Sequence, residues 1–306
     1  MIGLTLKHLR YFDALARCGH FGRAAEACAI TQPALSLQIK ELESILSAQL
    51  VERTAREIRL TPLGENFLVR ARKVLLEVEE IGELVRSAEG PLSGRLRLGI
   101  IPTVGPYLLA RVIMALSDRF PTLEIQPRES MTKALIADLI QSRLDAAIVA
   151  LPISETALHE CALFQEDFVL VRPREDKDKP IPSVENLQKM RLLLLEEGHC
   201  FRDQALSFCK MSAAKPPDLM EASSLATLVQ LVGAGIGVTL IPEMAVPQEI
   251  HSANVSVARL SAPPPSRTIG MVWRKTNPIA PHLKEIGDIV REVAKVGAKD
   301  CLGDYA

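Results

Sequence analysis

Four features are missing from this sequence, and each absence excludes a class of protein. It has no Cys-x-x-Cys pair, no membrane-length apolar run, no secretory leader pattern and no excess of basic residues. Its six cysteines are scattered over 306 residues, unlike the framework of a disulfide-stabilised secreted domain. The longest uncharged stretch, 222–242, contains polar residues and three glycines, which indicates a helix, a turn and a buried strand. Charged residues at 7, 10, 13 and 17 interrupt the segment where the apolar core of a leader would run. We therefore expect a cytoplasmic protein.

The composition is that of a folded protein with no strong overall charge. Lys and Arg number 36 against 37 Asp and Glu, giving a formal net charge of -1. This balance excludes a uniformly basic nucleic-acid coat protein but allows one basic face. A hydrophobic content of 48% suffices for real cores, and at about 150 residues per domain the length suggests two domains with room for a smaller third.

Residues 1–60 show the pattern of an all-α helix-turn-helix. Apolar residues at 6, 9, 12 and 15 predict a first helix that Gly19 ends, and those at 21, 24, 25 and 28 predict a short second one. Thr31 is a good N-cap for a third helix, whose apolar face carries residues 35, 39, 42 and 46. The small pair Ala24 and Ala25 allows the second and third helices to cross closely.

The outer face of the third helix indicates DNA reading. Gln32, Ser36 and Lys40 form one stripe, and arginines follow in a segment, 51–62, that predicts a two-stranded wing. The alternative is an ordinary solvated polar face, since residues 1–73 carry 11 basic against 7 acidic residues, a net of only +4. The residues we expect to contact DNA are Thr31, Gln32, Pro33, Ser36, Lys40, Arg53 and Arg56.

Residues 61–90 predict a long helix with a narrow apolar stripe. The stripe steps by four and three residues, which is the seam of a coiled coil, and most of the remaining side chains are charged. Such a helix normally pairs with a copy of itself, although packing on the chain's own second domain is the alternative. The expected dimerisation residues are Phe67, Ala71, Val74, Val78, Ile81 and Val85.

From Gly94 onward, strands and helices alternate, which predicts an α/β domain with parallel sheets and helices on both faces. In such sheets, ligands bind beyond the carboxyl ends of the strands. Thr103 and Thr132 follow the first and second predicted strands and suit a small polar ligand. The alternative is that these threonines cap the helices they precede.

The segment 196–209 carries the most informative chemistry. Cys200 follows a predicted strand and opens a predicted helix beside His199 and Arg202, a setting that raises thiol reactivity. Cys209 lies nine positions on, roughly 13 Å along a continuous helix, whereas a disulfide needs Cα atoms within about 7 Å. The thiols can bond only if the helix unwinds, which would make a two-state element. Buried inert cysteines, a zinc site of His199, Cys200 and Cys209, and a catalytic Cys–His pair are the alternatives.

The sequences FGRAAEACAITQPALSLQIKELE (21–43) and LVERTAREIRLTPLGE (50–65) closely resemble the LysR-type transcriptional regulators. The resemblance implies a winged helix-turn-helix at 1–60, a dimerising linker helix at 61–90 and an effector domain at 91–306. The effector domain would resemble the two-lobed periplasmic binding proteins. Its lobe I would comprise about 94–165 and 268–300, and its lobe II about 166–267.

Within that family, three segments resemble the members that sense hydrogen peroxide: IPTVGPYLL (101–109), EEGHCFRDQALSFC (196–209) and RTIGMVWR (267–274). The resemblance implies that Cys200 is the peroxide-reactive thiol and Cys209 its resolving partner. It also implies that further residues hold the peroxide or brace the loop, namely Thr103, Thr132, His199, Arg202, Asp203 and Arg267.

The resemblance also implies the partners. They are double-stranded promoter DNA, further copies of the chain as a dimer or tetramer, hydrogen peroxide as effector, RNA polymerase and a thiol reductant. No cofactor, metal, membrane or enzymatic turnover is expected. The runner-up is a LysR-type regulator with inert cysteines that binds a small metabolite between its lobes, and a third interpretation is a thiol peroxidase with an appended DNA-binding domain. One stretch departs from the family pattern: Leu219, Met220 and Glu221 stand where polar and basic side chains are expected.

Overall fold

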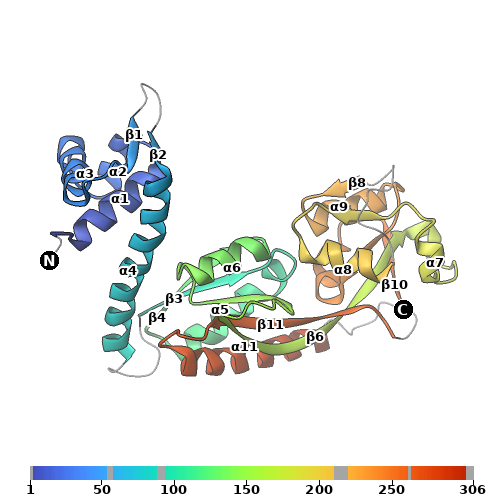
Figure 1. Ribbon diagram of the computed structural model, residues 1–306. Helices are drawn as coiled ribbons and strands as arrows, with labels where there is room; N and C mark the ends of the chain where they lie inside the picture. The colour runs from blue at the N-terminus through green and yellow to red at the C-terminus, as the bar shows by residue number, and fades with distance from the viewer. Residues whose placement is uncertain (1–2, 54–57, 88–93, 210–219, 261–262, 301–306) are drawn as a thin grey trace. The chain divides into compact units, whose positions relative to one another are not determined.

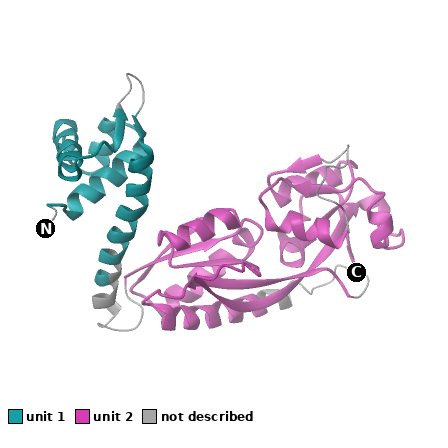
Figure 2. Ribbon diagram, in the orientation of Figure 1, with its two compact units in different colours: residues 1–85 teal, residues 86–306 magenta. Residues whose placement is uncertain are grey.

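The computed structural model describes residues 3–53, 58–87, 94–209, 220–260 and 263–300 (Figure 1). The chain forms two compact units, residues 1–85 and 86–306 (Figure 2). Among the described residues, no helix combines the length and apolarity needed to cross a membrane. The Arg56 expected to contact DNA, together with Leu219 of the departing stretch, lies outside the described residues.

Short-range signals build the N-terminal unit. It comprises α1 (Leu6–Cys18), α2 (Phe21–Ala27), α3 (Gln32–Leu46), β1 (Val51–Arg53), β2 (Ile58–Leu60) and α4 (Pro62–Ser87). Gly19 ends α1 in the left-handed conformation with φ 61°, and the Thr31 side chain caps α3 by accepting from the Ala34 amide. Both Ala24 and Ala25 are buried. β1 and β2 pair antiparallel, so the predicted wing is present.

The C-terminal unit contains the remaining elements. They are β3 (Gly94–Ile100), α5 (Gly105–Arg119), β4 (Leu123–Glu129), α6 (Thr132–Ile140), β5 (Ala146–Leu151), β6 (Leu158–Pro173), η1 (Arg174–Asp176), α7 (Val184–Leu187), β7 (Leu193–Leu195), α8 (Cys200–Phe208), β8 (Met220–Ala222), α9 (Leu225–Gly233), β9 (Thr239–Pro242), η2 (Glu243–Ala245), α10 (Val246–Glu249), β10 (Val255–Arg259), β11 (Ser266–Arg274) and α11 (Ala280–Asp300). The expected helix, turn and buried strand of 222–242 are α9, its glycine turn and β9.

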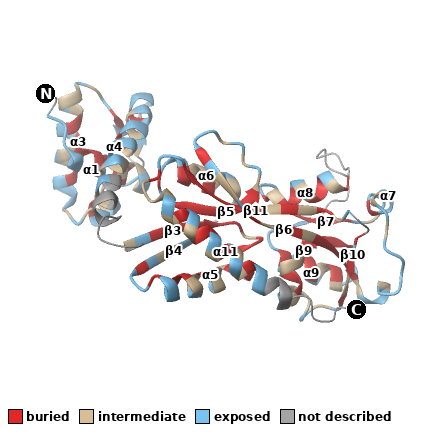
Figure 3. Cartoon of the chain, turned by 90° about the horizontal axis from the view of Figure 1, so that it is seen from below, coloured by how far each residue is buried: buried red, intermediate tan, exposed pale blue. Residues whose placement is uncertain are grey.

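Two hydrophobic cores divide this unit into lobes. One lies among β3, α5, β5 and α11, and the other among β7, α8, α9 and β9. Buried residues follow the strands of both lobes (Figure 3). The long strands β6 and β11 pass from one lobe to the other, as Figure 1 shows.

The expectation of parallel sheets holds for only part of the unit. β3 pairs parallel with β4 and β5, and β7 pairs parallel with β8. However, β11 pairs antiparallel with β5 and β6, and β6 pairs antiparallel with β9 and β10. The reason is the connection between lobes: β6 leaves the first lobe and β11 returns to it, so these strands run in opposite directions.

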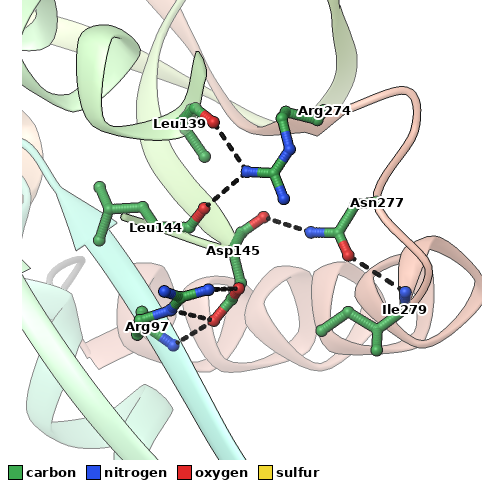
Figure 4. A network of polar contacts seen from close by, with 7 residues as sticks. All are labelled: Arg97, Leu139, Leu144, Asp145, Arg274, Asn277 and Ile279. Atoms are coloured by element: carbon green, nitrogen blue, oxygen red, sulfur yellow. Dashed lines mark hydrogen bonds and ion pairs between the residues drawn. The ribbon is translucent and has the colours of Figure 1, made fainter. Parts of the chain in front are cut away.

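A buried polar network fastens the loop after α6 to the end of β11 (Figure 4). The Asp145 carboxylate accepts from the Arg97 side chain at 2.7 Å and from its backbone amide at 2.7 Å. Asn277 donates to the Asp145 carbonyl at 3.1 Å, and Arg274 donates to the Leu139 carbonyl at 2.7 Å. Because Leu139 belongs to the last turn of α6, this network anchors the helix that begins at Thr132.

Candidate functional site

The predicted reading helix presents a polar face to solvent. Leu35, Ile39 and Leu42 are fully buried against the core of the N-terminal unit. Gln32, Pro33 and Lys40 are exposed, as is the capping Thr31, and Ser36 is partly exposed. Arg53 belongs to β1, and its side chain is outside what the structure describes.

The apolar stripe of α4 is divided between two environments. Phe67 packs edge-on against Phe12 at a ring-centroid distance of 5.4 Å, and Ala71 is only 2% exposed. These two positions therefore contact the core of their own unit. Further along the helix, Val74 is 46% exposed and Ile81 is 65% exposed. Val78 is half-buried, and the side chain of Val85 is not described.

The two cysteines stand at opposite ends of one continuous helix. Cys200 is the first residue of α8, and Cys209 is its C-cap. The nine-residue separation therefore corresponds to roughly 13 Å along the axis, too far for a bond in this state. The described cysteines are all free thiols. Bonding Cys200 to Cys209 requires α8 to unwind.

The two thiols belong to different cores. Cys200 is partly exposed and packs against the core of the first lobe, although its helix belongs to the second. Cys209 is fully buried in the core of the second lobe, and this burial raises its pKa to about 11. Cys200 thus lies at the junction of the lobes, while Cys209 is a protonated core thiol in this state.

A buried arginine joins the lobes beside the cysteine helix. Arg267 donates through Nη1 to Thr103 Oγ1 at 2.7 Å and through Nη2 to the Thr103 carbonyl at 3.0 Å. Its Nε donates to Glu166 Oε2 at 2.7 Å, and its guanidinium lies 5.4 Å from the ring centroid of Phe201. Since the Thr103 hydroxyl accepts from Arg267, its own proton is free to be donated to a ligand.

Glu166 holds the Arg267 side chain through an ion pair. It is buried, and its Oε1 accepts from the Met244 amide at 3.2 Å. Burial raises the pKa of Glu166, and the neighbouring Arg267 opposes that shift. Removing either partner would leave the other buried without its counter-charge.

Two residues expected at the site carry a buried polar atom without a hydrogen-bond partner in the described part of the chain, Thr132 at Oγ1 and His199 at Nε2. The residues just before them in the chain are neighbours: the Met131 sulfur lies 4.0 Å from the position that a Cβ on Gly198 would occupy. Buried polar atoms are almost always hydrogen-bonded, so an unpaired pair of this kind fits a small polar ligand.

Neither threonine caps a helix, which removes the alternative that the sequence left open. The N-cap of α6 is Met131 and that of α5 is Val104, and neither cap position makes a side-chain capping bond. Thr132 is instead the first helical residue, and Thr103 is held by Arg267.

The other residues expected at the site differ in their contacts. Arg202 is buried, and its Nη1 donates to the Leu195 carbonyl at 3.1 Å and to Glu221 Oε1 at 2.6 Å. Asp203 is exposed in the first turn of α8. Within the described residues, no group of three or more His, Cys, Asp or Glu side chains is placed to hold a metal ion. Cys209, one of the three residues of the alternative zinc site, is fully buried in the apolar core of the second lobe.

Sequence reasoning missed three residues of this region. Glu166 gave no signal, because its partner Arg267 is 101 positions away. Phe201 reads as an ordinary apolar helix residue. Gln204, whose Oε1 is buried without a partner in the described chain, lies one helical turn after Cys200, so helical spacing would have found it.

Protonation of His199 should weaken the effector unit at acid pH. Burial lowers the pKa of His199, and Glu196 opposes this shift. When the pKa of a base is lower in the folded state than in the unfolded state, the unfolded chain takes up the proton first as the pH falls. The contribution of His199 to stability is therefore complete at a pH above its ordinary pKa of 6.5 and is lost as the pH falls below it. We expect the free energy of unfolding to drop below pH 6.5 by up to about 1.4 kcal/mol per pH unit from this group.

The single tryptophan, Trp273, lies in β11 and reports on this unit alone. Denaturant titrations of the reduced protein, followed by its fluorescence, should give a shallower acid slope for His199→Gln. The matched control is the exposed His251, changed to Gln. An equal slope in the wild type and His199→Gln would contradict the prediction.

Comparison with known proteins assigns both units. Residues 6–65 match the family of bacterial regulatory helix-turn-helix proteins of the lysR type, and residues 89–295 match the LysR substrate binding domain. A "Hydrogen peroxide-inducible genes activator" of Dickeya chrysanthemi is 40% identical over 94% of this chain and 95% of its own. A full-length OxyR cysteine variant from Pseudomonas aeruginosa is 38% identical, with a TM-score of 0.75 over 94% of this chain and 95% of that one.

A third relative is a peroxide-bound OxyR cysteine variant from Corynebacterium glutamicum. It is 33% identical, with a TM-score of 0.66 over 97% of this chain and 94% of that one. These likenesses confirm the resemblance that the sequence indicated. The chain belongs to the LysR family of helix-turn-helix transcriptional regulators.

Proposed function

We propose that this regulator senses hydrogen peroxide through a reversible Cys200–Cys209 switch and controls oxidative-stress genes. The observation that carries the proposal is the setting of Cys200 at the junction of the lobes. The neighbouring loops hold two buried polar atoms without partners, on Thr132 and His199. Relatives named as peroxide-inducible activators, and one solved with peroxide bound, support the choice of ligand.

Each pocket residue has a role that follows from its contacts. Arg267 orients the Thr103 hydroxyl as a donor, and Glu166 holds Arg267. Thr132 and His199 supply the further polar atoms that a peroxide molecule would pair with. Arg202 braces the first turn of α8 through Leu195 and Glu221, and the exposed Asp203 is assigned to the same turn by its position alone.

The chemistry takes place in two steps. The Cys200 thiolate attacks one peroxide oxygen, the O–O bond breaks, and the other oxygen leaves as hydroxide and takes a proton to become water. The Cys200 sulfenic acid then reacts with the Cys209 thiol, forming the S–S bond and releasing a second water. The two thiols lose two electrons and the peroxide gains them. A thiol reductant restores the starting state.

The structure of α8 makes the second step a conformational one. Cys209 must leave the second core and the helix must unwind before the sulfurs meet. We propose that this remodelling changes how the subunits associate and therefore which DNA half-sites they bind. The protein would act as a stoichiometric sensor of this kind rather than as an enzyme.

A helix-turn-helix of this family binds DNA, and α3 is the element we assign to the major groove. Its exposed polar residues, together with the wing, would contact bases and phosphates at Thr31, Gln32, Pro33, Ser36, Lys40, Arg53 and Arg56. We propose that α4 pairs with a second copy, giving a dimer and then a dimer of dimers that meets RNA polymerase at promoters in the cytoplasm.

Thiol mapping after a brief, low-dose peroxide pulse tests the proposal. The wild type, Cys200→Ser and Cys209→Ser are analysed by mass spectrometry and footprinted on the same DNA. We expect a 200–209 disulfide and a shifted footprint in the wild type alone, and a trapped sulfenic acid on Cys200 in Cys209→Ser. Unmodified thiols at a dose that oxidises a sensor would refute the proposal and favour a metabolite-responsive regulator.

A further inference from the structure

An ion pair ties the first turn of the cysteine helix to the strand β8. Arg202 Nη1 and Glu221 Oε1 are 2.6 Å apart, and the side chains are 8% and 31% exposed. The same nitrogen donates to the Leu195 carbonyl at 3.1 Å. Glu221 pairs with Leu194 in the parallel β7–β8 register, so one guanidinium links α8 to the last residue of β7 and the middle residue of β8.

This ion pair lies within the segment that must rearrange. Arg202 sits between the two cysteines, and its backbone amide donates to the His199 carbonyl at 3.1 Å as part of the first turn. Joining residues 200 and 209 within about 7 Å changes the backbone of the residues between them. The contacts of Arg202 to β7 and β8 are made from the first turn of the helical form, so unwinding of that turn would break them.

We propose that Glu221 is a positioning residue that sets the oxidation threshold of the thiol switch. By holding Arg202, it stabilises the helical, reduced form of α8 and makes the disulfide harder to form. The inference rests on the proposed function and leaves its reaction unchanged: peroxide is the oxidant, and the two thiols supply the electrons. Glu221 acts on the equilibrium between the two forms.

Glu221 is an acidic residue at a position where the family pattern predicts polar or basic side chains. Glu221 belongs to the stretch that departs from the expected polar and basic pattern, and an acid here finds the guanidinium of Arg202. Among the described residues, loss of the carboxylate leaves the largely buried Arg202 side chain with the Leu195 carbonyl as its acceptor. A buried cation that loses its counter-charge destabilises the state in which it is buried, which here is the reduced one.

The test is a redox titration of full-length protein in glutathione buffers, with the 200–209 disulfide counted by mass spectrometry. Glu221→Gln should shift the equilibrium about tenfold toward the disulfide, equivalent to about 30 mV for a two-electron couple. In a Cys209→Ser background, the same change should alter the rate of sulfenic acid formation at Cys200 by less than this tenfold shift, because the effect of Glu221 is placed on the unwinding of α8. Glu185→Gln, at an exposed site on α7, is the matched control and should not move the potential.

Further variants separate the ion pair from a general loss of stability. Glu221→Asp keeps the charge and should restore most of the wild-type potential. Arg202→Gln should shift the equilibrium the same way as Glu221→Gln, and the double variant should shift it no further than the larger single change. A Glu221→Gln potential equal to that of the wild type would overturn the inference. A wild type that never forms the 200–209 disulfide would overturn the proposed function instead.

Discussion

Thr103→Val is expected to slow the reaction of Cys200 with hydrogen peroxide about a hundredfold. When the O–O bond breaks, negative charge develops on the departing oxygen, and a fixed donor aimed at that oxygen lowers the barrier. The Thr103 hydroxyl accepts from Arg267 at 2.7 Å, so its proton is directed away from Arg267. Valine has nearly the same shape but cannot donate.

The measurement is the rate constant for sulfenic acid formation in a Cys209→Ser background, where the reaction stops after the first step. Thr103→Ser keeps the hydroxyl and should retain a rate within a few-fold of the parent. Thr156→Val makes the same chemical change at an exposed turn and should have no effect. A Thr103→Val protein that reacts at the parental rate would assign peroxide activation to Thr132 and His199.

Folding must be checked alongside, because Thr103 is buried and its loss leaves one Arg267 nitrogen without its acceptor. The other contacts of Arg267 remain, to the Thr103 carbonyl at 3.0 Å and to Glu166 at 2.7 Å. The fluorescence of Trp273 reports on the integrity of this unit. An intact unit with a slow reaction would locate the effect in the chemistry.

The parts of the fold that depend on neighbouring residues could be predicted from the sequence. Thr31 caps α3 through an amide three residues on, and the apolar stripe from Leu35 to Leu42 is buried as its spacing indicated. The separation of Cys200 and Cys209 along one helix also followed from counting residues. In each case the deciding interaction spans only a few positions of one element.

The parts that depend on distant contacts could not be derived from spacing. Thr103 and Arg267 are 164 positions apart, and only the resemblance placed them together. Glu166, which holds Arg267, carries no local signal at all. Strand direction in β6 and β11 was mispredicted for the same reason, since it depends on how the chain passes between lobes.

Ile81→Asp should split the proposed dimer and weaken binding to a two-half-site operator at least a hundredfold. Two linked DNA-binding domains gain affinity because the second one binds at a high local concentration. This gain vanishes when the two domains separate. Ile81 is 65% exposed on α4, so the substitution should not unfold the chain that carries it. An aspartate in a helix–helix seam would instead bury an unpaired charge in the assembled state.

The division of the α4 stripe decides which positions are informative. Phe67 and Ala71 pack within their own unit, so changes there would confuse folding with association. Val69 is 58% exposed on the same helix but outside the stripe, and Val69→Asp is therefore the matched control. Sedimentation equilibrium should show a monomer for Ile81→Asp and the wild-type assembly for Val69→Asp. On the same operator, Ile81→Asp should give the weakened footprint and Val69→Asp the wild-type footprint. Both variants introduce the same charge at an exposed apolar site. A monomeric Val69→Asp together with an intact Ile81→Asp assembly would therefore place the interface on another face of α4.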